Sequence, residues 1–283
     1  MKNLIIRALT GIAFVAVMVY GILHSPATFA VLFLLITCLS VWEFTGIVNL
    51  RADVNVNRFI TTVAGGCLFV AFFGYGAGIA GAGALFVPWL LSMIYMLVSE
   101  LYLQRESPLN DWAYAMMSQV YVALPFSLLC LLEFMCIGIR PADSDSINYG
   151  PLLVLAIYVF LWLNDTGAYC VGSLLGRHKL FPRISPGKSW EGSIGGAVVC
   201  LAVSLVAAHY LPVFTPLQWV GFALVVVVFG TWGDLVESLL KRQLGIKDSG
   251  HILPGHGGML DRFDSSLLAI PAVVIYLCLL ATL

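Results

Sequence analysis

Acids, bases and glycines crowd into residues 238–264 of a chain that is otherwise mostly apolar. Charged groups at the edge of a membrane span are costly, so they are usually kept for a function. The bases of this segment are Lys241, Arg242, Lys247 and Arg262, and its acids are Asp248, Asp261 and Asp264. Carboxylates bind hard metal ions, and bases pair with phosphates. The pattern therefore predicts a site for metal ions and the phosphates of a nucleotide at the membrane surface.

One helix face is predicted to carry part of this site. Asp234, Glu237, Ser238 and Lys241 stand at positions i, i+3, i+4 and i+7. Residues with that spacing lie on the same face of a helix. A face with so much charge is not expected to point at lipid, so we expect it to face the site.

Two aspartates are the predicted metal ligands. Asp261 and Asp264 are three residues apart and share a helix face if the last apolar helix begins that early. Mg²⁺ prefers one or two carboxylates, with water and phosphate oxygens in its other positions. We predict that Asp234 and Asp261 bind Mg²⁺, and that Glu237, Asp248 and Asp264 orient the neighbouring bases. The competing explanation is a set of purely structural salt bridges, but the density of charge favours a function.

Glycines are predicted to shape the loop between these helices. Gly250, Gly255, Gly257 and Gly258 can adopt φ > 0, which lets backbone amides approach a phosphate closely. His256 lies between glycines and is either a catalytic acid or a residue that shapes the turn, and the second role is favoured.

A second polar segment occupies residues 164–191. Asn164 and Asp165 lie in an apolar run whose small residues would allow close helix packing, with Asp165 turned inward. Helix packing explains the glycines of this run but not the two polar residues. Because this segment and residues 234–264 both mix acids, bases and turn residues, we predict that they form one site.

The loop at the end of that segment contains a G-K-S sequence, which is not a P-loop. The first glycine of the P-loop pattern is replaced by Pro182, and the flanks are apolar helices instead of a strand and a helix. Ser189 and Glu191 open a new helix, whose N-terminal amides favour an anion beside Lys188. A simple N-cap explains Ser189 alone equally well.

The remainder of the chain is predicted to cross a membrane. Of its 283 residues, 60% are hydrophobic and 10% are charged, and the mean hydropathy is +0.97. Such a composition excludes a soluble globular domain. We predict an all-α, polytopic protein with about nine transmembrane helices, at 8–23, 27–48, 59–76, 81–102, 112–136, 151–175, 190–210, 217–240 and 264–283. The glycine-rich residues 74–83 leave open whether the third and fourth are one broken helix.

The charges predict how the chain is oriented. With a cytoplasmic N-terminus, nine spans place thirteen of the 14 lysines and arginines in cytoplasmic segments and only Arg140 outside. The C-terminus would then lie outside. We divide the chain into N-terminal transmembrane helices (1–110) and a catalytic transmembrane region with a cytoplasm-facing site (111–283). A net charge of -1 gives no indication of nucleic-acid binding.

These motifs resemble those of the bacterial phosphatidate cytidylyltransferases, also called CDP-diacylglycerol synthases. Residues 238–264 match the signature S-x-x-K-R-x4-K-D-x-G-x2-L-P-G-H-G-G-x-x-D-R-x-D throughout. Residues 164–192 are similar to a second motif, D-[ST]-x-A-Y followed by I-S-P-x-K-T-x-E-G. The chain departs from the usual pattern at Ser189, where threonine is common, and at Ser173, where many members have a base. The motifs cover about the last 120 residues, and the first half matches only as hydrophobic spans.

The resemblance implies transfer of a cytidylyl group from CTP to phosphatidate, which gives CDP-diacylglycerol and pyrophosphate for phospholipid synthesis. It implies an all-helical homodimer in the bacterial inner membrane, with Mg²⁺ and a monovalent cation such as K⁺ as cofactors. The family's metal-binding aspartates correspond to Asp234 and Asp261, the same two that the spacing indicates. The loop Ser185–Lys188 and the turn at His256 carry over as contacts to nucleotide and phosphate.

The predicted site residues fall into two sets. The catalytic set is Asp234, Lys241, Asp261, Arg262 and Asp264. The substrate-binding set is Asn164, Asp165, Ser185, Lys188, Ser189, Glu191, Glu237, Arg242, Lys247, Asp248, His256, Gly257 and Gly258. A lipid phosphate oxygen would attack the α-phosphorus of CTP in line, while the bases stabilise the leaving pyrophosphate or the lipid phosphate.

Other functions are weighed against this one. A transporter would show internal repeats and a site at the bilayer midplane, whereas the charge here gathers at one face. A CTP-dependent lipid kinase, or a cytidylyltransferase acting on another lipid phosphate, would share much of the pattern. A structural scaffold would leave both charged segments unexplained. Glu43 and Glu133 lie far from the motifs, and each is either a functional acid or a residue with an inward hydrogen bond.

Overall fold

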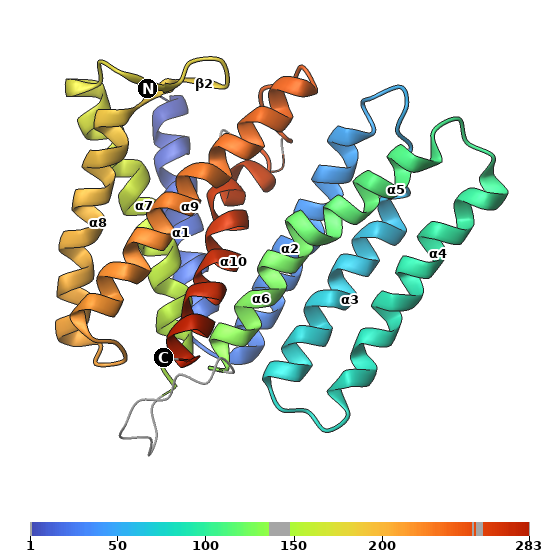
Figure 1. Cartoon of the computed structure of the whole chain (residues 1–283), viewed down its shortest axis with the longest axis horizontal. Helices are drawn as coiled ribbons and strands as arrows, with labels where there is room; N and C mark the ends of the chain where they lie inside the picture. The colour runs from blue at the N-terminus through green and yellow to red at the C-terminus, as the bar shows by residue number, and fades with distance from the viewer. Residues whose placement is uncertain (1, 136–147, 251, 253–256, 283) are drawn as a thin grey trace. The chain divides into compact units, whose positions relative to one another are not determined.

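The computed structural model describes residues 2–135, 148–250, 252 and 257–282. Its elements in the first half of the chain are α1 (Lys2–Leu23), α2 (Pro26–Val48), α3 (Arg58–Gly76), the 3₁₀ turn η1 (Ala82–Phe86), α4 (Val87–Leu103), α5 (Pro108–Met117), the π-helix η2 (Ser118–Ala123) and α6 (Leu124–Glu133). Those in the second half are α7 (Gly150–Leu175), β1 (Lys179–Phe181), β2 (Ser185–Ser189), α8 (Trp190–Tyr210), α9 (Pro216–Gln243) and α10 (Leu260–Thr282). The protein is therefore almost entirely helical, as predicted (Figure 1).

Eight helical segments in the described part of the chain are long and apolar enough to span a membrane. The predicted first span, 8–23, corresponds to the apolar stretch Leu9–Leu23 of α1, which is shorter than these eight segments. The third and fourth predicted spans are separate helices, since α3 ends at Gly76 and the next span begins at Ala82. The protein is thus a multi-pass membrane protein. The orientation of its termini stays a prediction, and Arg140 lies outside the described residues.

The chain divides into two compact units, which we describe separately. Unit 1 comprises Met1–Phe134 and Gln243–Phe263, and unit 2 comprises Met135–Arg242 and Asp264–Leu283. Helix α10 contributes its first turn to unit 1 and the rest to unit 2. The predicted division at residue 110 concerned where the catalytic part begins, and it stays a prediction.

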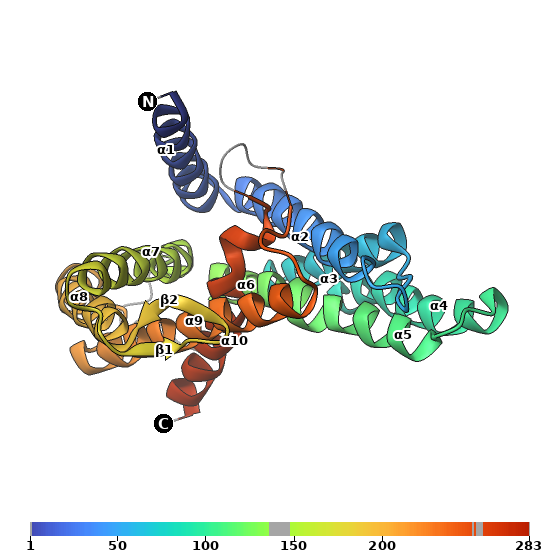
Figure 2. The same ribbon diagram turned by 90° about the horizontal axis from the view of Figure 1, so that it is seen from above.

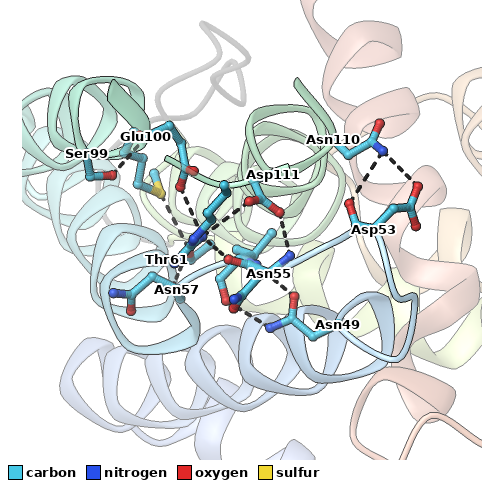
Figure 3. A network of polar contacts seen from close by, with 12 residues as sticks. Asn49, Asp53, Asn55, Asn57, Thr61, Ser99, Glu100, Asn110 and Asp111 are labelled. Carbon is cyan, nitrogen blue, oxygen red and sulfur yellow. Dashed lines mark hydrogen bonds and ion pairs between the residues drawn. The ribbon is translucent and has the colours of Figure 1, made fainter. Parts of the chain in front are cut away.

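Unit 1 has an aromatic core and a polar clamp. Phe126 meets Phe263 edge to face, with ring centroids 5.5 Å apart. In the clamp, Arg105 pairs with two buried acids, Glu100 at 3.0 Å and Asp111 at 3.3 Å. Asp111 also accepts a hydrogen bond of 2.5 Å from the backbone amide of Asn55 (Figure 3). The clamp ties the loop before α3 to α4 and α5, and it satisfies acids that would be costly to bury unpaired.

Glycines bring α7 and α8 into close contact in unit 2, where the two helices run side by side in both views (Figures 1 and 2). A Cβ on Gly167 would come within 3.0 Å of the Cα of Gly196, and one on Gly192 within 2.8 Å of the carbonyl oxygen of Ala168. This confirms the predicted packing role of small residues. Tyr169 lies on the same helix, α7, but its side chain is 77% exposed.

The one departure from an all-helical chain among the described residues is the hairpin of β1 and β2 (Figure 2). The two strands pair antiparallel, with Lys179 opposite Ser189 and Phe181 opposite Ser185. Glu191 closes the base of the hairpin, because its carboxylate accepts hydrogen bonds from the backbone amides of Arg177 and His178. The short loop thus has an ordered shape before α8 begins.

Candidate active site

A cavity of about 580 Å³ lies within unit 2, between α7, the hairpin, α8 and α9. Its polar lining includes residues of both predicted motif segments: Asn164, Asp165, Lys188, Ser189 and Asp234. Lys179 and Thr231 line it as well, although neither is among the predicted site residues. A volume of this order is typical of pockets that hold small molecules.

An ion pair joins the two motif segments inside this cavity. Lys188 Nζ, on β2, lies 2.6 Å from Asp234 Oδ2, on α9. The other oxygen of Asp234 accepts a hydrogen bond of 3.1 Å from Ser238 Oγ, one turn further along α9. The helix face predicted from the spacing therefore exists, and the residues around 164–191 and 234–242 do come together in unit 2.

Two further carboxylates lie near the Asp234 member of this pair. Asp165 on α7 and Asp264 on α10 are both near enough to Asp234 to interact with it electrostatically. Asp165, predicted to turn inward, is exposed and lines the cavity. Gly233 permits the close approach of α9 to α10, since a Cβ there would lie 2.6 Å from the carbonyl oxygen of Asp264. Three negative charges in a confined space favour the binding of a cation.

A buried ion pair lies next to this group on α9. Glu237 is fully buried, and its Oε2 is 2.5 Å from the ammonium of Lys241. A structural salt bridge of this kind is what the competing explanation predicted for these acids and bases. It orients Lys241 as predicted, and it also satisfies a carboxylate that is shielded from water.

Asn164 is almost completely buried on the inner side of α7, with 4% of its surface exposed. Its amide nitrogen donates to Thr231 Oγ1 at 3.5 Å. Its side-chain oxygen is buried and accepts no hydrogen bond within the described residues. This oxygen faces α8, since a Cβ on Gly196 would lie 2.5 Å from it.

The described residues of the loop between α9 and α10 (244–259), which we call the signature loop, belong to unit 1. Asp261 contacts this loop at two points. Helix α10 starts at Leu260, so Asp261 does lie in its first turn. Its Oδ2 accepts hydrogen bonds from the amides of Ser249 and Gly258, both at 2.9 Å. Asp261 therefore holds Ser249 and Gly258 together, a structural role that differs from the predicted binding of metal.

The glycines of this loop have two different functions. Gly257 has φ of +83°, as predicted for a residue that bends the backbone. The prediction was wrong for Gly250 and Gly258, which are not among the glycines with positive φ. They are glycines because other groups occupy the space of a side chain: a Cβ would lie 2.5 Å from a Glu43 oxygen at either position. Gly255 and His256 lie outside the described residues.

Several predicted substrate contacts hold the local structure, and among these only Ser189 also lines the cavity. Arg242 donates from Nε to the carbonyl oxygen of Ile184 at 3.3 Å and so holds the tip of the hairpin. Ser189 is the N-cap of α8, with its hydroxyl accepting from the amide of Gly192 at 3.2 Å. Ser185 opens β2, and exposed side chains are found at Lys247, Asp248 and Arg262.

The residue that the motifs did not reveal is Glu43, on α2 in unit 1. Its carboxylate is buried beneath the signature loop and accepts a hydrogen bond of 2.8 Å from the amide of Leu260. The sequence signal was an acid inside an apolar span, which left a function and an inward hydrogen bond open as alternatives. Glu133 is fully buried on α6.

The chain is similar to known proteins over nearly its whole length. The family model described as "Cytidylyltransferase family" matches residues 5–280. The chain belongs to the cytidylyltransferase family. It is 39% identical over 191 residues to the phosphatidate cytidylyltransferases of Staphylococcus aureus, Staphylococcus saprophyticus and Staphylococcus haemolyticus. These matches cover 66% of this chain and 68% of each relative.

Membership of the cytidylyltransferase family extends over nearly the whole chain, so it includes the N-terminal helices that carry no motif. The family resemblance stated from the motifs is thereby confirmed, and the protein is an enzyme of the membrane. Within the described residues, no group of three or more His, Cys, Asp or Glu side chains forms a ready-made metal site. Mg²⁺ in proteins usually keeps water and substrate phosphate oxygens as ligands beside one or two carboxylates.

Proposed function

We propose that the protein transfers a cytidylyl group from CTP to phosphatidate, releasing pyrophosphate and leaving CDP-diacylglycerol in the membrane. The observation that carries this proposal is the contact of Lys188 with Asp234 in a cavity lined by both motif segments. A base and carboxylates in one cavity suit a polyanion that arrives with a cation. The named activity of the staphylococcal relatives agrees with this chemistry.

The donors of unit 2 fit a divalent metal ion. Asp165, Asp234 and Asp264 lie on three different helices and carry hard oxygen atoms, and Mg²⁺ would need only one or two of them beside phosphate and water oxygens. That Asp234 and Asp261 are the protein ligands, and that a monovalent cation such as K⁺ binds as well, stay proposals drawn from the sequence. When bound, Mg²⁺ would offset the negative charge on the phosphates during transfer.

The protein's own part in the reaction is mainly positioning and charge. An oxygen of the phosphatidate phosphate forms a bond to the α-phosphorus of CTP, while the bond from that phosphorus to the oxygen between the α- and β-phosphates breaks and pyrophosphate leaves with that oxygen. A phosphate monoester is already ionised near neutral pH, so no general base is needed. Lys188 and Lys241 would balance charge on the phosphates.

The setting also suits two substrates of different solubility. The cavity lies next to the hairpin, where α7 ends and α8 begins, and so at the ends of two membrane spans. CTP would enter from water, and the lipid phosphate would come from the bilayer surface. We place this end at the cytoplasmic face of a bacterial inner membrane, in keeping with the distribution of lysine and arginine. A homodimer is the proposed assembly.

The test uses purified protein in mixed micelles with phosphatidate, Mg²⁺ and CTP labelled at the α-phosphate. Label should enter the lipid only when both lipid and metal are present, with one pyrophosphate released per labelled lipid. A lipid kinase would release labelled CDP and leave the lipid unlabelled. Folded protein that labels no lipid phosphate would disprove cytidylyl transfer.

A further inference from the structure

Glu43 lies near the C-terminal end of α2, far in sequence from the signature loop that it contacts. Its side chain is 95% buried, since only 5% of the residue is exposed. Oε2 accepts hydrogen bonds from the hydroxyl of Ser249 at 3.2 Å and from the amide of Leu260 at 2.8 Å. One carboxylate oxygen therefore binds the loop at both of its ends.

Asp261 binds the same loop from the other side. Its Oδ2 accepts from the amide of Ser249, whose hydroxyl donates to Glu43. The amide of Gly258 also donates to Asp261. Two residues later, the amide of Leu260 donates to Glu43. The two carboxylates thus share the loop between them, and a shift of one end of the loop is transmitted to the other.

The glycines of the signature make this contact possible. A Cβ on Gly250 would lie 2.5 Å from Glu43 Oε1, and a Cβ on Gly258 would lie 2.5 Å from Oε2 and 2.3 Å from Ser249 Oγ. Neither glycine is needed for a positive φ. Their absence of a side chain is therefore explained by the carboxylate of Glu43, which connects part of the signature to a residue outside both motifs.

We propose that Glu43 is a positioning residue, which holds the signature loop so that Asp261 keeps the orientation needed for turnover. The proposal rests on the proposed function for its catalytic consequence, but the loop contact itself does not depend on that function. An acid buried in an apolar span is retained at a cost, and here it accepts hydrogen bonds from the backbone amide of Leu260 and the hydroxyl of Ser249. Groups that orient a catalytic carboxylate commonly affect activity without touching substrate.

The test compares Glu43→Gln with Glu100→Gln. Both replace a buried acid of unit 1 by its isosteric amide, but Glu100 pairs with Arg105 and does not contact the signature loop. Ser249→Ala removes the hydroxyl that donates to Glu43 while leaving the backbone amide that donates to Asp261. The double variant Glu43→Gln/Ser249→Ala completes a cycle that reports whether the two residues act together.

Two measurements are made on the full-length protein in detergent. Amide hydrogen exchange of a peptide covering residues 244–260 reports the order of the loop without any substrate. Initial rates with varied CTP and Mg²⁺ give kcat, the KM for CTP and the Mg²⁺ concentration at half-maximal rate. A purely structural role would lower the melting temperature without raising the Mg²⁺ requirement.

For Glu43→Gln we expect faster exchange in the loop, a kcat lower by about 10- to 100-fold and a higher Mg²⁺ requirement, as for other residues that orient metal ligands. Ser249→Ala should have a smaller effect, and the double variant should lose less than the product of the two single losses. Wild-type exchange and kcat in Glu43→Gln, or an equal loss of kcat in Glu100→Gln, would overturn the proposal.

The two proposals fail in different ways. If the wild-type protein labels no lipid but Glu43→Gln still loosens the loop, the proposed function is wrong and the positioning of the loop stands. If the wild-type protein is active and Glu43→Gln changes neither exchange nor kcat, the positioning role is wrong and the proposed function stands.

Discussion

Lys188 Nζ and Asp234 Oδ2 are 2.6 Å apart, although one belongs to a hairpin strand and the other to a membrane helix 46 positions later in the sequence. The pair is only partly buried, with about a quarter of each side chain exposed, 25% and 28%. An ion pair in that setting can exchange partners when a polyanion and a cation arrive. It therefore marks the place in unit 2 where the two kinds of ligand are expected to meet.

Removing the base of this pair should stop catalysis with little effect on folding. For Lys188→Met we expect a kcat lower by about 100-fold or more, because one charge that stabilises the transferring phosphate is lost. Lys188→Arg should retain part of the activity. Arg183→Met, an exposed base in the same hairpin, is the matched control and should turn over normally. Rates are measured as labelled lipid formed per minute, and normal turnover by Lys188→Met would remove this residue from the site.

Asp261→Asn should separate the loop-closing role of this residue from its proposed metal-binding role. The asparagine oxygen can still accept from the amides of Ser249 and Gly258, so the loop should remain ordered. The charge needed to bind Mg²⁺ is lost, so turnover should be abolished. The measurement is the labelled-lipid assay, with a thermal melt to confirm folding. A near wild-type rate would exclude Asp261 as a metal ligand.

Gly257→Ala should both strain the backbone and displace Asp261. A side chain at φ of +83° costs about 1–2 kcal/mol. Its Cβ would in addition lie 2.8 Å from Asp261 Oδ2. Gly245→Ala is the control, because Gly245 also has a positive φ, +68°, but no atom lies within 4 Å of its Cβ position. Both variants should melt earlier, and only Gly257→Ala should lose most of its kcat; equal kcat in the two would contradict the argument.

Gly196→Ala should destabilise unit 2 by overpacking the contact of α7 with α8. The new Cβ would lie 2.5 Å from Asn164 Oδ1 and 2.6 Å from the carbonyl oxygen of Asn164. Because a backbone atom cannot yield easily, we expect a loss of about 1–3 kcal/mol in the free energy of unfolding. Gly83→Ala, at a position with open space, should be neutral. Chemical unfolding in detergent micelles checks both, and a neutral Gly196→Ala would show that the helices can separate freely.

Glu237→Gln should test the buried pair on α9. Breaking a buried ion pair by removing one charge costs about 3–5 kcal/mol of stability. Asp53→Asn breaks the exposed pair with Arg51, where the two side chains are 43% and 41% exposed, and should change stability little. The melting temperatures of the two variants give the comparison. Equal shifts would mean that burial does not decide the strength of the Glu237 pair.

The sequence predicted those parts of the site that depend on local spacing. The common face of Asp234 and Ser238 follows from helical periodicity, and the hydrogen bond between them confirms it. The N-cap at Ser189 and the early start of α10 have equally local signals. Apolar runs of sufficient length predicted the spans, because the bilayer sets the length of an apolar helix.

The rest depends on contacts that no local pattern encodes. Glu43 and Ser249 are 206 residues apart, and nothing in the sequence around either one indicates the other. The hairpin at Lys179–Ser189 depends on Glu191 folding back onto two backbone amides. The prediction for Gly250 and Gly258 was wrong for the same reason, since the group that excludes a side chain there comes from α2.

The separation of Glu43 from its partners also has a consequence for biosynthesis. Helix α2 is made early, but the amide of Leu260 that binds Glu43 comes 217 residues later. At the usual pace of about 5–20 residues per second, the ribosome needs roughly 10–40 s to reach it. During that interval Glu43 lacks the partners that it has in the folded protein. Its part of α2 therefore reaches its final structure only after the start of the last helix has been synthesised.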